Sequence, residues 1–460
     1  MEITFDKEVS FNKNFNRSLI ALVIPIALQN LISAAVNSAD IVMLSTVSQS
    51  AMSAISLAGQ ISFVAMFFYM GLAIGAGILT AQYWGKKDIS SISRVLNIAC
   101  MFSIIISLFF FITSISFPSI LMQIFTKDVE LIMYGVKYQR VISLTYLAMS
   151  LSQMYLTVVK SMEKVRFSAI VSTVSLLLNV ILNAVAIYVL FPQKPESAII
   201  GVAVATVIAR YVELSCCIFY SLRKENVKFS LPIYDNIQKV LFKDYLHYTI
   251  PVIANYIVYG GALAAIVVII GHVSSDLVAA NAIASVVKNL AIVLCGGIGG
   301  GGSVLVGKYL GSGELATAKK AGKKIYLYAF VFGVIAGITI LLIRPLVFSI
   351  ISVNANAQNY LNAMLFICAV YCIGKSVNST IIGAIFPAGG DAKFGFWCDV
   401  IVMWGIIIPL GCLCAFVWHV TPIELYIVLC CDEFIKGPIA IIRFFQYRWI
   451  KNITRDFNCA

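Results

Sequence analysis

Long apolar runs, each ended by a short polar or glycine-containing stretch, follow one another along almost the whole chain. A helix needs about 20 mostly apolar residues to cross the hydrocarbon core of a membrane, and twelve runs reach that length. They cover roughly 18–45, 52–84, 95–124, 133–158, 167–191, 199–221, 247–271, 278–307, 324–350, 360–386, 394–418 and 422–446. Within the runs apolar and polar positions rarely alternate, which argues against a membrane β-barrel. The pattern predicts an all-α polytopic membrane protein with twelve transmembrane helices.

The composition agrees with this pattern. Of the 460 residues, 60% are hydrophobic and 12% are charged, whereas a soluble domain carries about 25% charged residues. Lipid must therefore cover most of the surface. Nearly all of the twelve cysteines lie in apolar runs, where they act as small hydrophobic side chains rather than as a disulfide framework. The three histidines are isolated and there is no Cys-x-x-Cys pair, so these residues predict no metal site.

The net charge of +12 reflects 33 Lys and Arg against 21 Asp and Glu. Most of the basic residues lie before the first run, after the even-numbered runs and at the C-terminal end. Such a distribution marks the cytoplasmic side of a membrane protein. It predicts a multi-pass protein of the cell membrane with both termini in the cytoplasm, and it explains the basic excess without nucleic acid as a partner.

The two halves of the chain resemble each other at a fixed offset of 226 residues, and repeats of this kind indicate duplicated architecture. The matching positions are Pro25 and Pro251, Ser48 and Ser274, Gly71 and Gly297, and Gly75 and Gly301. One additional residue of offset matches 161–167 with 388–394. Chance is a poor explanation for one offset that persists over such a distance.

Six predicted helices in each half make the second half enter the membrane in the same orientation as the first. The sequence therefore predicts two parallel-repeat, six-helix lobes with a cavity between them. We expect an N-lobe at 1–222, a cytoplasmic linker with a short interfacial helix at 223–246, and a C-lobe at 247–460.

Several segments resemble the multidrug and toxic compound extrusion (MATE) family. They are Ile24-Pro25-Ile-Ala-Leu, Gly71-Leu-Ala-Ile-Gly75, Ala81-Gln-Tyr-Trp-Gly85, Gly201-Val-Ala-Val-Ala205, Gly299-Gly-Gly-Gly-Ser303 and Ala388-Gly-Gly-Asp391. The resemblance covers essentially the whole chain and implies a MATE-like fold. It also implies a secondary active antiporter that exports organic drugs and toxic compounds, expected to be cationic, in exchange for H+ or Na+ by rocker-switch alternating access. The chain is similar to the DinF-like branch of the family, because it has Asp40 and has no carboxylate in the seventh run.

Asp40 is the main candidate for ion coupling. It follows Asn30, Ser33 and Asn37 at helical spacing, so four polar groups share one face. The fifth run carries a second polar stripe, made of Ser172, Ser175, Asn179 and Asn183. Polar stripes are costly in lipid unless they face each other or water. We therefore expect the two stripes to meet inside the N-lobe.

In this hypothesis Asp40, with Asn37, Asn179 and Asn183, binds and releases the coupling ion. A buried carboxylate holds a proton more tightly than one in water, and oxygen ligands also suit Na+, so both ions remain open. An organic cation would compete with the ion for Asp40. Asn183 stands where some relatives have an aspartate, which weighs against a mechanism with two carboxylates. The structural alternative is a polar cluster that only holds helices together.

Four polar residues are predicted to contact the substrate: Asn30, Ser33, Tyr256 and Tyr259. In the C-lobe, Lys288 and Lys375 lie within apolar runs and need acids or water around them. Asp399 and Glu433 are their expected partners. A structural ion-pair network and a substrate-binding role are both open interpretations of these four residues. The coupling ion is the only expected cofactor, and Na+ at Asp40 is the only metal considered.

One alternative is a flippase for lipid-linked oligosaccharides, since MATE-like proteins belong to a wider superfamily that includes such flippases. Twelve spans and Asp40 argue against it, whereas Lys288 and Lys375 favour it. An enzyme is not expected, because the sequence brings together no set of nucleophile, base and metal. The expected partners are small organic cations and membrane lipid, and the chain is expected to act as a monomer.

Overall fold

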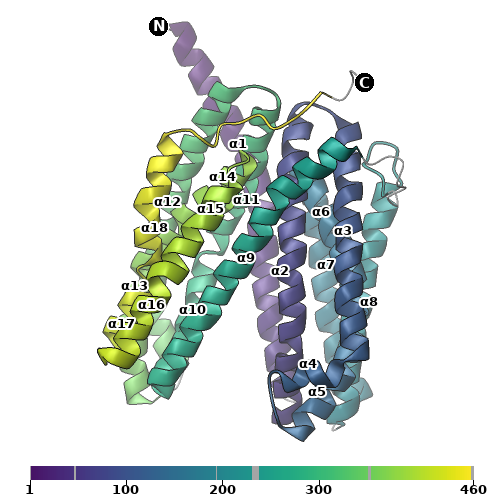
Figure 1. Cartoon of the computed structure of the whole chain (residues 1–460), viewed down its shortest axis with the longest axis vertical. Coiled ribbons are helices and arrows are strands. Elements are labelled where there is room, and N and C mark those ends of the chain that lie inside the picture. The colour runs from purple at the N-terminus through teal and green to yellow at the C-terminus, as the bar shows by residue number, and fades with distance from the viewer. Residues whose placement is uncertain (1, 46–47, 193, 230–237, 351–353, 457–460) are drawn as a thin grey trace. The chain divides into compact units, whose positions relative to one another are not determined.

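The computed structural model describes residues 2–45, 48–192, 194–229, 238–350 and 354–456. This part of the chain is helical and contains no strand (Figure 1). Ten of its helices are long and apolar enough to cross a membrane. Helices α5 (Val129–Ile142) and α6 (Thr145–Ser161), bent by 49°, supply an eleventh span if they are taken as one. The predicted all-α polytopic class is confirmed.

Several predicted runs are divided between consecutive helices, among them the eighth and the twelfth. The run at 278–307 contains α10 (Ser275–Ala291) and α11 (Val293–Gly311), and the run at 422–446 contains α17 (Pro422–Leu429) and α18 (Asp432–Phe445). A capping box starts α17, because the Thr421 hydroxyl accepts from the backbone N–H of Glu424 while the Glu424 carboxylate accepts from that of Thr421. The last run therefore begins with a capped helix and is broken before Asp432.

Contacts divide the chain into two compact units. Unit 1 comprises Met1–Ala27 with Ala254–Ala460, and unit 2 comprises Leu28–Ile253. The division cuts helices α1 (Glu2–Ser45) and α9 (Lys239–Val273). The first part of each helix is thus grouped with the opposite half of the sequence.

The predicted lobe bounds stay a prediction. The division into units groups residues by their contacts and does not test where one repeat ends and the next begins. Helix α9 already begins at Lys239, inside the segment predicted as the linker. The described residues 223–229 contain turns rather than a helix, and residues 230–237 lie outside the described part. The expected interfacial helix would fall largely on that segment.

Unit 2 is a bundle in which α2 contacts α3, α5 and α6, and α7 contacts α8. Besides the parts of α1 and α9 and the α5–α6 pair, its elements are α2 (Gln49–Gly85), α3 (Ile89–Ser116), α4 (Pro118–Gln123), α7 (Val165–Ala184), the π-helical η1 (Val185–Leu190) and α8 (Pro195–Ser221). Its buried polar groups are largely neutral. Gln139 Nε2, for example, donates to Ser114 Oγ at 2.7 Å and to Tyr146 Oη at 2.8 Å.

Unit 1 is built around the neighbouring helices α12 and α13. Besides α10, α11, α17 and α18, its elements are α12 (Leu315–Ile350), α13 (Ala355–Thr380), η3 (Ile381–Ile385), α14 (Phe386–Ala388), α15 (Ala392–Asp399), η4 (Val400–Ile407), α16 (Ile408–Cys412) and η5 (Leu413–Val417). The three η segments are π-helical, a conformation that often occurs at functional positions. Segment η4 follows directly after Asp399.

The repeat seen in the sequence recurs in local geometry. Ser48 caps α2 by accepting from the Ala51 N–H, and Ser274 caps α10 by accepting from the Asp276 N–H. Such caps satisfy backbone donors that a helix start leaves open.

Both repeats also use glycines where a helix from the other half of the sequence crosses. In unit 2, a Cβ at Gly71 would lie 2.9 Å from Ile253 Cα, on the first part of α9. In unit 1, a Cβ at Gly297 would lie 3.1 Å from Ala27 Cβ, on the first part of α1. These two contacts are related by the same offset of 226 residues. Close backbone approach explains these glycines.

Candidate functional site

Five charged residues gather inside unit 1, on helices α13, α15 and α18. We call them the charge cluster: Lys375, Asp399, Asp432, Glu433 and Lys436. Four of the five side chains are buried, and Lys375 is partly exposed. Ionised groups in such a position are costly unless they are paired and hydrogen-bonded. Their partners therefore determine whether the site is stable.

Lys436 is surrounded by all three acids of the charge cluster. Its Nζ lies 3.2 Å from Asp399 Oδ1, 3.0 Å from Asp432 Oδ2 and 3.6 Å from Glu433 Oε1. Asp432 and Glu433 precede Lys436 by one helical turn on α18, so their side chains share its face. Asp399 reaches it from the end of α15, and its other oxygen accepts from Asn255 Nδ2 at 2.7 Å. The ammonium thus joins α18 to α15, and Asn255 extends the contact to α9.

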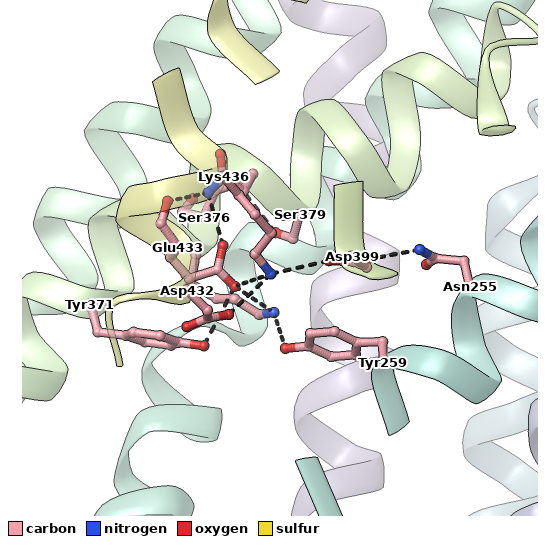
Figure 2. Close-up of polar contacts among 11 residues, drawn as sticks. Asn255, Tyr259, Tyr371, Ser376, Ser379, Asp399, Asp432, Glu433 and Lys436 are labelled. Carbon is pink, nitrogen blue, oxygen red and sulfur yellow. Dashed lines mark hydrogen bonds and ion pairs between the residues drawn. The ribbon is translucent and has the colours of Figure 1, made fainter. Parts of the chain in front are cut away.

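Glu433 is the most heavily bonded acid of the charge cluster. Its Oε1 accepts from Lys375 Nζ at 3.0 Å and from Tyr371 Oη at 3.4 Å. Its Oε2 accepts from Asn378 Nδ2 at 2.9 Å, and the same amide donates to the Glu433 backbone oxygen at 2.7 Å. Lys375 also donates to the hydroxyl of Tyr259 on α9. Figure 2 shows the hydroxyls of Tyr259 and Tyr371 directed toward the centre of the cluster from opposite sides.

The sequence prediction and the structure agree on part of this network. Lys375 lies beside Glu433, whereas Asp399 pairs with Lys436 and not with Lys288. Lys288 instead places its Nζ 4.7 Å from the centroid of the Tyr371 ring, a cation–π contact. Sequence reasoning assigned Lys436 no role. Its one-turn spacing from Asp432 and Glu433 was the signal that could have identified it.

The predicted polar stripe of α7 makes its described contacts with α8. Asn179 Nδ2 donates to Thr206 Oγ1 at 3.0 Å, and Ser175 Oγ donates to the Ala209 backbone oxygen at 3.0 Å. Asn183 Nδ2 lies 3.4 Å from Asn179 Oδ1. The structure therefore brings Asn179 and Asn183 together, and Asn179 contacts α8.

The polar stripe of α1 is described only in part. Ser33 Oγ donates to the backbone oxygen of Gln29 at 2.9 Å, and Asn30 is half-buried. The side chains of Asn37 and Asp40 lie outside the described residues, although the backbone there is part of α1. The predicted meeting of the two stripes thus stays a prediction.

The predicted substrate residues are divided between the two units. Tyr259 contacts Lys375 in unit 1, and Tyr256 is half-buried one turn before it on α9. Asn30 and Ser33 belong to unit 2. Their joint role in binding a substrate stays a prediction.

An ion pair with a buried acid, on α8 of unit 2, was missed by sequence reasoning. Arg210 Nη1 lies 2.8 Å from Glu213 Oε2 within α8, and the Glu213 side chain is 4% exposed. The spacing of three residues inside an apolar run was the available signal. Glu213 is thus a buried acid within the helices of unit 2.

Among the residues that the structure describes, no group of three or more His, Cys, Asp or Glu side chains is arranged to hold a metal ion. The acids of the charge cluster are directed instead at lysine, asparagine and tyrosine donors. The described site is therefore one of ion pairs and hydrogen bonds within a polytopic membrane protein.

Comparison with known proteins places this architecture in a family. The family model described as MatE matches residues 25–185 and 251–413, one segment in each half of the chain. The chain belongs to the MatE family of membrane transporters. Because these proteins are transporters, the expectation that the chain is not an enzyme is confirmed. The DinF-like branch stays a prediction.

Relatives match along nearly the whole length. The uncharacterized transporter YisQ of Bacillus subtilis is 24% identical over 94% of this chain and 95% of its own. The multidrug resistance protein NorM of Photobacterium profundum is 24% identical over 96% and 97%. A solved outward-facing conformation of a multidrug resistance MATE family transporter of the MOP superfamily has a TM-score of 0.84 at 16% identity, covering 94% of this chain and 95% of that one. This structural likeness shows the shared fold.

Proposed function

We propose that this transporter exports organic compounds, chiefly cationic ones, in exchange for H+ or Na+ by alternating access of its two halves. The observation that carries the proposal is the match of both halves to the MatE family model, at residues 25–185 and 251–413. A relative that matches along nearly its whole length is named a multidrug resistance protein. A duplicated helical bundle with polar groups at depth in each repeat suits rocking about a central site.

We place the coupling site at Asp40, with Asn37, Asn179 and Asn183 as neighbours. An acid within a membrane helix is by default a functional candidate, and a stripe of amides would supply oxygen ligands for Na+ or hydrogen bonds for a protonated carboxyl. Binding of H+ or Na+ to Asp40 from outside the cell would neutralise the carboxylate and so lower its attraction for an organic cation. Coupling follows only if the ion binds the two conformations with different affinity.

Glu433 and Lys436 of the charge cluster serve a structural role in this proposal. Glu433 and Lys436 join α13, α15 and α18, and their removal would leave buried charges without partners. The flippase alternative depended on Lys288 and Lys375 as free cations. Since Lys375 is paired with Glu433, that alternative rests on Lys288 alone, and we do not adopt it.

The direct test is ethidium efflux from drug-sensitive cells that express the chain. The proton gradient and the sodium gradient are collapsed separately, each with a selective ionophore. We expect efflux to stop in one of the two cases, and that case identifies the coupling ion. Asp40→Asn should abolish coupled efflux while the protein still reaches the membrane. Glu314→Gln, at an exposed position, is the matched control and should export normally. Wild-type efflux by a folded Asp40→Asn protein would refute the role of Asp40.

The same proposal places both termini in the cytoplasm of the cell, because the basic residues cluster on that side. A reporter that is active only outside the cytoplasm should stay silent when it is fused to either end. Activity at either terminus would contradict the topology but not the transport function.

A further inference from the structure

Lys288 differs from every lysine of the charge cluster. It lies on α10, inside the apolar run 278–307, and its side chain is half-buried. In the described part of the chain, no Asp or Glu oxygen lies within 4.0 Å of its Nζ. Its described contact is the face of the Tyr371 ring. An ammonium has three N–H donors. A ring face attracts the positive charge but does not act as a hydrogen-bond acceptor for all three donors.

The most exposed member of the neighbouring charge cluster is also a lysine. The Lys375 side chain keeps 20% of its area exposed, whereas Glu433 keeps 1%. Asp399 and Asp432 keep 8% and 3%. The carboxylates are therefore enclosed, and Lys375 is the member of the charge cluster whose side chain is most accessible.

Tyr371 connects the two lysines. Its ring lies beneath Lys288, and its hydroxyl donates to Glu433, which in turn binds Lys375. Lys375 lies 4.4 Å from the centroid of the Tyr259 ring. Two cations are thus held by aromatic rings within helices of unit 1, a combination that suits an anionic group attached to an apolar body.

We propose that Lys288, with the exposed side of Lys375, binds an anionic group of an organic ligand, of which a carboxylate is the simplest form. The rings of Tyr259 and Tyr371 contact the apolar part of that ligand. The identification of the ligand as a transported compound rests on the proposed export function. In a zwitterionic compound, the carboxylate would be the group that Lys288 binds.

The test compares norfloxacin, which carries both a carboxylate and an ammonium, with its methyl ester, which keeps only the ammonium. Binding to the purified full chain in phosphatidylcholine nanodiscs is measured by calorimetric titration. We expect the wild-type protein to bind the acid about tenfold more tightly than the ester, since a hydrogen-bonded charge pair has an effect of that order. Lys288→Gln should bind the two equally, while Lys288→Arg should keep a preference.

Lys320→Gln is the control, because it makes the same charge change at an exposed position of unit 1. It should bind like the wild type. An equal affinity of the wild type for acid and ester, or an unchanged preference in a folded Lys288→Gln protein, would overturn the proposal.

Added phosphatidylglycerol separates two sources of the anionic group. If this lipid competes with norfloxacin in the wild type but not in Lys288→Gln, a lipid headgroup also reaches the site, and the anion-binding role is supported. A lack of competition, with the acid preference intact, assigns the site to the organic ligand. Normal ethidium efflux without an acid preference would reject this inference alone, whereas an acid preference in a chain that exports nothing would reject the proposed export function alone.

Discussion

The sixth helices of the two repeats begin at equivalent residues, Pro195 in unit 2 and Pro422 in unit 1, which are 227 residues apart. At that offset three charged residues of the charge cluster match uncharged residues of unit 2. The matching pairs are Ser172 with Asp399, Thr206 with Glu433, and Ala209 with Lys436. Unit 2 joins α7 to α8 through amides and hydroxyls, whereas unit 1 joins α15 to α18 through ion pairs.

This difference shows that two repeats with the same arrangement of helices can be held together by different interactions, neutral hydrogen bonds in one and ion pairs in the other. A neutral hydrogen bond contributes modestly to stability, and its loss can be tolerated. A buried ion pair contributes little net stability, but removing one partner strands the other charge. Unit 1 is therefore the more sensitive half to single polar substitutions, and the predictions below rank this sensitivity.

The largest effect is expected at Glu433. Glu433→Gln leaves Lys375 without its carboxylate and removes one of the acids around Lys436, so we expect a loss of about 3–5 kcal/mol in the free energy of unfolding. The midpoint of denaturation in detergent measures it. Glu196→Gln, which breaks the exposed pair with Lys137, should cost less than about 1 kcal/mol. Equal losses would remove the distinction between buried and exposed charge.

Helix crossings give the second effect. A Cβ at Gly75 would lie 2.7 Å from Thr249 Cβ, whereas one at Gly301 would lie 3.1 Å from Leu22 Cβ. Gly75→Ala should therefore destabilise the protein by about 1–3 kcal/mol through overpacking. Gly301→Ala, at the equivalent crossing in unit 1, should cost less than about 1 kcal/mol because small shifts relieve its contacts. The same denaturation assay compares them, and the reverse order would show that the two crossings are not packed as described.

A neutral contact of unit 2 gives a smaller change. Thr206→Val removes the hydroxyl that accepts from Asn179 while it keeps the shape of the side chain. We expect a loss of about 1 kcal/mol, the usual contribution of one hydrogen bond. A loss as large as that of Glu433→Gln would contradict the contrast between the two units.

The smallest effect is a gain. Lys87 adopts a left-handed conformation with φ 62°, and Gly313, its match in the second repeat, has φ 81°. A residue with a Cβ is strained there and glycine is not. Lys87→Gly should therefore stabilise the protein by about 0.5–1 kcal/mol, seen as a higher denaturation midpoint. A lower midpoint would mean that the Lys87 side chain contributes more than its backbone strain removes.

Much of the fold could be predicted from the sequence because apolar runs and helix caps act locally. The offset that paired Ser48 with Ser274 also paired their roles as helix caps. The cut of α1 and α9 between units could not be predicted, because it depends on which helices cross at Gly71 and Gly297. Hydropathy does not encode those long-range contacts.

The candidate site was only partly predictable for a related reason. Spacing along one helix could link Lys436 to Asp432 and Glu433, but no sequence pattern indicates that Asp399 at the end of α15 reaches the same ammonium. Tertiary packing also gave Lys288 a tyrosine ring rather than an acid. The free-energy cost of an ionised side chain within the membrane predicts that a buried charge needs a partner, but it does not identify that partner.

The division of roles between the two halves is tested most directly by transport into proteoliposomes under an imposed gradient of the coupling ion. We predict that Asp40→Asn abolishes the gradient-driven transport of both ethidium and norfloxacin, and that Lys288→Gln weakens norfloxacin transport alone. If Asp40→Asn transports both compounds at the wild-type rate, or Lys288→Gln lowers both equally, the assignment of coupling to the first half and anion recognition to the second is contradicted.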